Sequence, residues 1–169
     1  VSGSASGIGA AVRSRLERQD DRVIGIDLRD AEVETDLSTG EGRKAALAAV
    51  LERCEGRLDR LVLSAGLGVQ VTPISLIASV NYFGAVDMIK AVLPGMRERE
   101  RGHIINISSM TGLVANPPNV YYSSTKFALE ALSDALRLEL AGTGIRISLI
   151  EPGPIDTRFI DGALAAARR

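Results

Sequence analysis

Runs of aliphatic and β-branched residues alternate along the chain with longer stretches of helical periodicity. We predict strands at residues 23–27, 32–36, 61–64, 103–108 and 146–151, and helices at 9–19, 40–54, 80–98 and 120–141. Strands that alternate with helices are typical of stacked βα units around a parallel sheet. Each predicted strand is almost continuous in apolar residues, as expected when helices cover both faces of a sheet. The expected fold class is therefore α/β, with a doubly wound parallel sheet flanked by helices.

The composition is that of one globular domain. The chain has 169 residues, of which 46% are hydrophobic, so we expect residues 1–169 to form a single domain with a buried core. Twenty basic residues balance 21 acidic ones, which indicates neither a nucleic-acid nor a membrane-surface partner. No apolar stretch approaches the ~18 residues of a membrane span. One cysteine and one histidine predict no disulfide and no metal site, and we expect a soluble cytoplasmic protein.

A glycine-rich loop, Gly3-Ser4-Ala5-Ser6-Gly7-Ile8-Gly9, precedes the first predicted helix. Such a loop is either a tight turn or an anion site, where backbone N–H groups and the helix dipole face a phosphate. Asp27 follows Gly9 by 18 residues, at the place where an acidic residue receives the ribose hydroxyls of a dinucleotide. A carboxylate there repels a 2′-phosphate, so we expect NAD(H). Arg29 is a solvated loop charge or, alternatively, a phosphate contact.

Tyr122 and Lys126 stand four residues apart at the start of the last predicted helix. This spacing occurs on ordinary helix surfaces, but it also places an ammonium and a phenol on one helix face. A phenol titrates near pH ~10, and a neighbouring positive charge brings it closer to the pH at which it can act as an acid or base. Ser109 precedes Tyr122 by 13 residues, while Ser108 is turned to the other face by strand alternation. The three residues predict proton transfer at a carbonyl.

Together, the glycine loop, Asp27, Ser109, the YxxxK run and Pro152-Gly153 resemble the short-chain dehydrogenase/reductase family, in the branch with a GxxxGxG loop. The resemblance extends from Val1 to about Phe159 and implies a Rossmann-like fold. The stretch that includes Asp27 and residues 80–84 is most similar to the bacterial 3α-hydroxysteroid dehydrogenases/carbonyl reductases of this family. Those enzymes carry a long insertion before the tyrosine, whereas 12 residues separate Ser109 from Tyr122 here.

The resemblance also implies roles for individual residues. Ser109 would bind the substrate carbonyl, Tyr122 would transfer the proton, and Lys126 would lower the pKa of Tyr122 and bind the nicotinamide ribose. Asn81 would support a water linked to Lys126. The expected cofactor contacts are Gly3, Ser6, Gly7, Ile8, Gly9, Asp27, Asp36, Leu37, Ala65, Gly66, Tyr122, Lys126, Pro152, Gly153, Ile155 and Thr157. An apolar substrate wall is expected from Leu67, Met110, Leu113, Val114, Pro117 and Phe159.

The function we expect is an NAD(H)-dependent oxidoreductase that interconverts a secondary alcohol and a ketone, with a small apolar substrate such as a hydroxysteroid. The alternatives are a catalytically silent NAD-binding protein and a ketoacyl-carrier-protein reductase. Family members pair the helices equivalent to residues 80–98 and 120–141, which implies a homodimer or homotetramer. They also have a complete first strand and a further helix and strand at the carboxyl end, so we expect the fold to be clipped at both ends.

Overall fold

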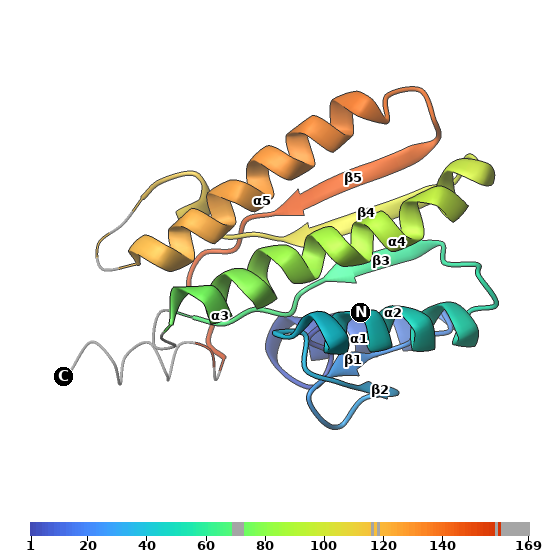
Figure 1. Ribbon diagram of the computed structural model, residues 1–169, viewed down its shortest axis with the longest axis horizontal. Helices are drawn as coiled ribbons and strands as arrows, with labels where there is room; N and C mark the ends of the chain where they lie inside the picture. Colours follow the sequence, from blue (N-terminus) through green and yellow to red (C-terminus); the bar gives the residue numbers. More distant parts are fainter. Residues whose placement is uncertain (69–72, 116, 118, 158, 160–169) are drawn as a thin grey trace.

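The computed structural model describes residues 1–68, 73–115, 117, 119–157 and 159, and contains a parallel sheet. Its strands are β1 (Ile26–Asp27), β2 (Val33–Glu34), β3 (Arg60–Leu63), β4 (Gly102–Ile107) and β5 (Ile145–Ile150). Ser2 bridges β1 on one side and β3 on the other, so the order is β2-β1-Ser2-β3-β4-β5 (Figure 1). The predicted α/β class and parallel sheet are confirmed.

The first two strands are much shorter than the predicted runs at 23–27 and 32–36. Only residues 28–32 connect β1 to β2, with Asp30 in the left-handed region at φ 57°. A parallel pair normally needs a crossover of about a dozen residues or more. Because so short a connection cannot return far along the strand, only two residue pairs align, Ile26 with Val33 and Asp27 with Glu34.

Helices occupy the four predicted positions, and the short helix α3 and two irregular turns were not predicted. The helices are α1 (Gly7–Glu17), α2 (Gly40–Arg53), α3 (Ile74–Ala78), α4 (Gly84–Glu98) and α5 (Val120–Glu139). A π-helical turn, η1 (Ser79–Phe83), joins α3 to α4, and a 3₁₀ turn, η2 (Met110–Gly112), follows β4. Neither turn was predicted, because hydrophobic periodicity does not distinguish a single π turn from α-helix.

The strand order reverses at Ser2, and this reversal separates the helices into two layers. Connections between parallel strands are right-handed, so α1, which leads toward β1, lies on one face of the sheet. The helices α2, α4 and α5 lead in the opposite direction and cover the other face (Figure 1). The core lies between the sheet and this second layer, where Met88, Met96, Ile104 and Leu129 are at most 2% exposed.

The continuous helical run Ile74–Glu98 corrects the expectation that no segment is long enough to span a membrane. Among the described residues it is the one helix that meets this test by length and composition, with a mean hydropathy of 1.4 in its most apolar window. Its residues Ala85, Met88, Ile89 and Val92 are buried in the core. The run has the character of a core helix of the α/β fold.

Candidate active site

A cavity of about 690 Å³ opens at the carboxyl ends of the parallel strands. Segments that follow Ser2, β1, β3, β4 and β5 line it. This is the edge at which open α/β sheets bind ligands, beside the point where the strand order reverses. Every residue predicted for catalysis or cofactor binding lines the cavity except Gly9 and Asn81.

The glycine loop forms one side of the cavity because its backbone passes very close to its neighbours. A Cβ on Gly3, which has φ +70°, would lie 2.7 Å from the backbone nitrogen of Ala65. A Cβ on Gly9 would lie 1.9 Å from the carbonyl oxygen of Gly3. Glycine at both positions therefore lets α1 begin directly against the loop.

The amino end of α1 is free to bind an anion. Ser6 is its N-cap, yet the Ser6 side chain makes no capping hydrogen bond, and the first turn contains no acidic residue. The first N–H groups of a helix have no partner within the helix and carry the positive end of its dipole. A phosphate in the cavity would meet these donors.

Asp27 lies at the carboxyl end of β1 and is fixed by the loop. Its Oδ2 accepts a hydrogen bond from the Ala5 N–H at 2.9 Å, and its Oδ1 accepts one from the Leu28 N–H at 2.8 Å. No Lys or Arg of the described chain forms an ion pair with this carboxylate. Asp36 also lines the cavity, and its Oδ1 accepts from the Ser38 N–H at 2.8 Å. The rim of the cavity is thus negatively charged.

Tyr122 and Lys126 face the cavity from the first turns of α5, with Ser109 opposite at the end of β4. Burial raises the pKa of Tyr122, and a hydrogen bond with the Ser109 side chain lowers it by less. Lys126 is 5% exposed, and its Nζ donates to the carbonyl oxygen of Ile107 at 2.8 Å. Burial lowers the pKa of Lys126 from 10.5 to about 8, although the charge of Glu130 acts in the opposite direction.

In the protein alone the net direction of the Tyr122 pKa is upward, so the lowering expected from Lys126 does not dominate. The Nζ atom lies over the face of the phenol ring, 5.5 Å from its centroid. In addition, burial lowers the pKa of Lys126, so its positive charge is less favourable than that of an exposed lysine. Desolvation of the phenol therefore outweighs the help that the neighbouring charge can give.

Asn81 lies in the π turn η1 and joins two walls of the site. Its Oδ1 accepts from the Leu67 N–H at 2.7 Å, and its Nδ2 donates to the Leu67 carbonyl at 3.0 Å and to the Thr125 hydroxyl at 3.2 Å. π turns are frequent at functional sites because they re-aim a side chain. The amide thereby connects the loop after β3 to α5. Thr125, which also bonds the Tyr122 carbonyl at 2.8 Å, was missed from the sequence.

The loop after β5 closes the cavity. A Cβ on Gly7 would lie 3.7 Å from the Thr157 side chain, so this loop approaches the glycine loop. The Phe159 ring lies 5.8 Å from the Tyr122 ring. Of the expected apolar wall, Leu67, Met110 and Phe159 line the cavity. Leu113, Val114 and Pro117 do not line it, and Leu113 and Val114 are 60% and 70% exposed.

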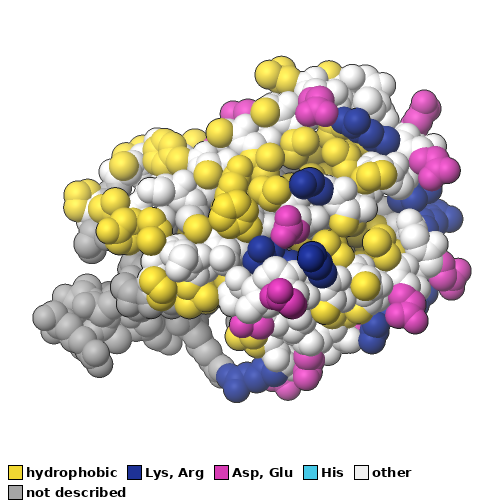
Figure 2. All heavy atoms as spheres, viewed as in Figure 1, with side chains coloured by type: hydrophobic (Ala, Val, Ile, Leu, Met, Phe, Trp, Pro, Cys, Tyr) yellow, Lys and Arg dark blue, Asp and Glu magenta, His cyan; other side chains and the backbone are white. Residues whose placement is uncertain are grey.

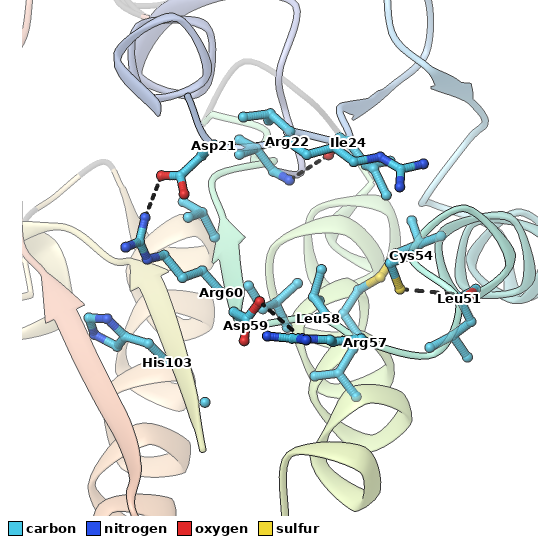
Figure 3. A pocket seen from close by; sticks show the side chains of 18 of the residues that line it. Asp21, Arg22, Ile24, Leu51, Cys54, Arg57, Leu58, Asp59, Arg60 and His103 are labelled. Atoms are coloured by element: carbon cyan, nitrogen blue, oxygen red, sulfur yellow. Dashed lines mark hydrogen bonds and ion pairs between the residues drawn. The ribbon is translucent and has the colours of Figure 1, made fainter. Parts of the chain in front are cut away.

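A second cavity, of about 660 Å³, lies at the opposite edge of the sheet, where β3 and β4 begin (Figure 3). Figure 3 shows two pairs of charged side chains along it: Arg60 bonds Asp21 at 2.5 Å, and Arg57 lies 3.8 Å from Asp59. No predicted site residue lines this cavity. The cavity at the carboxyl edge is therefore the candidate active site.

Three features of this site define a dinucleotide-binding α/β protein. They are a glycine loop at the amino end of a helix, an acidic residue after the next strand, and the point between them where the strand order reverses. The model of the short chain dehydrogenase family matches residues 1–166. The chain belongs to this family, whose members are oxidoreductases that bind a nicotinamide cofactor.

Two curated relatives illustrate the similarity. The chain is 36% identical over 199 residues to a 3-alpha-hydroxysteroid dehydrogenase/carbonyl reductase of Comamonas testosteroni, with 99% of this chain and 76% of the relative covered. It is 35% identical over 190 residues to human retinol dehydrogenase 8, with 98% of this chain and 61% of the relative covered.

Solved structures show the same fold. The 3-alpha-hydroxysteroid dehydrogenase from Pseudomonas sp. B-0831, complexed with NADH, superposes with a TM-score of 0.91 at 32% identity, with 99% of this chain and 76% of that chain covered. A metagenomic short-chain oxidoreductase in complex with NADP gives a TM-score of 0.78 at 28% identity, with 99% and 88% covered. Both cofactors thus occur among the structural neighbours.

Proposed function

We propose that this protein is an NAD(H)-dependent oxidoreductase that interconverts a secondary alcohol and a ketone. The observation that supports it most strongly is that Ser109, Tyr122 and Lys126 line one cavity together with the glycine loop and Asp27. A protein that only binds a dinucleotide has no physical need for the first three. When bound, the nicotinamide supplies or accepts the hydride at the carbonyl carbon.

The residues of the chain would handle the oxygen and its proton. In the reductive direction the Ser109 hydroxyl donates a hydrogen bond to the substrate carbonyl, which polarises it and stabilises the developing oxyanion. Tyr122 then transfers its phenolic proton to that oxygen. The buried ammonium of Lys126 stabilises the phenolate that remains until solvent returns a proton. Asn81 and Thr125 keep α5 in register with the opposite wall.

The cavity suits an adenine dinucleotide without a 2′-phosphate. The close approach of Gly3 and Gly9 leaves room for a pyrophosphate against the free N–H groups of α1. The remaining acceptor capacity of Asp27 suits two ribose hydroxyls, whereas its charge repels a phosphate. The carboxylate carries no ion pair within the described chain, so nothing there neutralises this repulsion.

Cofactor choice is tested by measuring Kd for NADH and NADPH from the fluorescence of the reduced nicotinamide, because the chain contains no tryptophan. The native protein is expected to bind NADH at least tenfold more tightly, which corresponds to about 1.4 kcal/mol, and Asp27→Ser is expected to narrow or reverse the ratio. Arg29→Ala is the matched control and is expected to leave the NADH affinity unchanged. Tighter binding of NADPH by the native protein would overturn the assignment and would favour the ketoacyl-carrier-protein reductase.

We propose hydroxysteroids as the first substrate class, because Leu67, Met110 and Phe159 give the cavity an apolar wall and because the relatives above include two steroid enzymes by name. A panel of hydroxysteroids, simple secondary alcohols and retinol, followed by NADH absorbance, tests this choice. Turnover of simple alcohols alone would contradict it. NADH binding without turnover of any compound would favour the silent NAD-binding alternative.

We also propose a homodimer or homotetramer formed through α4 and α5. Hydrophobic side chains gather over these helices in Figure 2. On α5, Phe127 and Leu138 are 42% and 80% exposed, and the small residues Ala131 and Ala135 lie on the same helix face, where they permit close packing. A monomeric mass at micromolar concentration in analytical ultracentrifugation would exclude this assembly.

A further inference from the structure

Glu130 lies one helical turn after Lys126 on α5, and the reaction proposed above does not use it. Its Oε1 atom is buried and has no hydrogen-bond partner in the described part of the chain. A buried carboxylate oxygen without a partner costs free energy unless a nearby opposite charge or a donor compensates for it. The position of Glu130 therefore requires an explanation.

The carboxylate faces the end of β4. A Cβ placed on Gly112 would lie 2.9 Å from Ser108 Oγ and 3.1 Å from Glu130 Oε1. Ser108 is 3% exposed, and its Oγ also has no partner among the described residues. Glycine at position 112 thus leaves a small space between the buried Ser108 hydroxyl and the buried Oε1 atom of Glu130.

Lys126 extends from α5 to the last residue of β4. Its Nζ donates to the carbonyl oxygen of Ile107, directly before Ser108. Lys126 and Glu130 are four residues apart on one helix face, and they extend from α5 toward the end of β4 and toward Gly112 of η2, respectively. We propose that Glu130 is a positioning residue, whose half-buried carboxylate acts through space on the neighbouring Lys126 and keeps its ammonium charged beside Tyr122.

The charges around Lys126 support this role. Burial lowers the pKa of Lys126, and in the described chain Glu130 is the charged group that raises it. The other elements that lie against Lys126 present uncharged groups: Nζ bonds the Ile107 carbonyl of β4, and Lys126 lines a small space together with Asn81 of η1. Tyr122 is the remaining titratable neighbour, with its ring 5.5 Å from Nζ. Loss of the Glu130 charge is therefore expected to lower the pKa of Lys126 further, so that Lys126 becomes neutral at a lower pH.

The experiment compares Glu130→Gln, which removes the charge but keeps the shape, with Glu130→Asp, which keeps the charge but shortens the side chain. The free energy of unfolding is measured against pH for each protein. The free energy of unfolding is expected to rise as Lys126 loses its proton. In Glu130→Gln this rise is expected to begin about 1 pH unit lower than in the native protein. In Glu130→Asp it is expected to begin at nearly the same pH as in the native protein. Glu139→Gln, which removes a carboxylate at an exposed position on the same helix, paired there with Arg97, is the control and is expected to leave the pH of this rise unchanged.

A second readout rests on the proposed function. The alkaline limb of kcat/KM for ketone reduction is expected to move to lower pH in Glu130→Gln and to be largely restored in Glu130→Asp. Equal shifts in the two variants, or no shift in Glu130→Gln, would overturn the positioning role. If the native protein has no turnover, the proposed function fails, but the unfolding measurements still test the effect of Glu130 on Lys126.

Discussion

The buried ammonium of Lys126 predicts an unusual pH dependence of stability. The pKa of Lys126 is lowered from 10.5 to about 8 in the folded protein. The difference of about 2.5 pH units corresponds to about 3 kcal/mol, at about 1.4 kcal/mol for each unit. Below about pH 8 both the folded and the unfolded chain carry this proton, so the full cost of burying the charge is present.

The sign of the effect follows from proton binding. Between about pH 8 and 10.5, the unfolded chain holds a proton that the folded protein has released, so the free energy of unfolding rises with pH. Above that range both states are neutral and the contribution is constant. Lys126 is therefore expected to add up to about 3 kcal/mol of stability as pH rises through this window.

The assay is chemical denaturation of the native protein and of Lys126→Met at a series of pH values. The difference between their free energies of unfolding isolates Lys126, since other titrating groups contribute to both. Lys44→Met, on the exposed side of α2, is the matched control and is expected to give a nearly constant difference. A constant difference for Lys126→Met across the window would show that water reaches the ammonium and would refute the reasoning.

Two further substitutions test the packing that supports the site. Gly9→Ala would place a Cβ 1.9 Å from the Gly3 carbonyl oxygen, so the glycine loop must shift, and we expect Kd for NADH to rise about tenfold or more with a loss of about 1–3 kcal/mol in the free energy of unfolding. Ser133→Ala removes the hydroxyl that accepts from Asn106 at 2.7 Å. Because Asn106 is fully buried, we expect a loss of about 1–3 kcal/mol, measured by chemical denaturation.

Each of these two substitutions has a matched control. Gly40→Ala adds the same methyl group where the nearest atom lies 4.0 Å away, and Ser124→Ala removes an exposed hydroxyl from the same helix as Ser133. Both controls are expected to change the free energy of unfolding by less than about 0.5 kcal/mol. Effects as large in the controls as in the test variants would contradict the assigned contacts.

The features that sequence predicted well are those with a strong local cause. The spacing of Tyr122 and Lys126 on one helix face and the position of Asp27 after an apolar run depend only on helical and strand geometry. The family model and the matching folds support the same α/β architecture. The short β1–β2 pair could also have been predicted, because residues 28–32 leave no room for a crossover. The apolar runs, taken alone, predicted longer strands.

Other features depend on contacts between distant segments and could not be predicted from pattern. The π turn at η1 brings the Asn81 amide to the backbone of Leu67, 14 residues earlier in the chain. The upward direction of the Tyr122 pKa follows from its burial, which periodicity does not measure. Likewise, the space between Ser108 and Glu130 exists only because Gly112 lies beside both.

The central claim is that Tyr122 transfers the proton in a site that binds NADH. It is tested most directly by comparing the native protein with Tyr122→Phe, which keeps the ring and removes the hydroxyl. NADH binding is followed by fluorescence and turnover with hydroxysteroids by absorbance. The account predicts that Tyr122→Phe binds NADH with nearly native affinity while kcat falls by about 100-fold or more. Native turnover in Tyr122→Phe would contradict it.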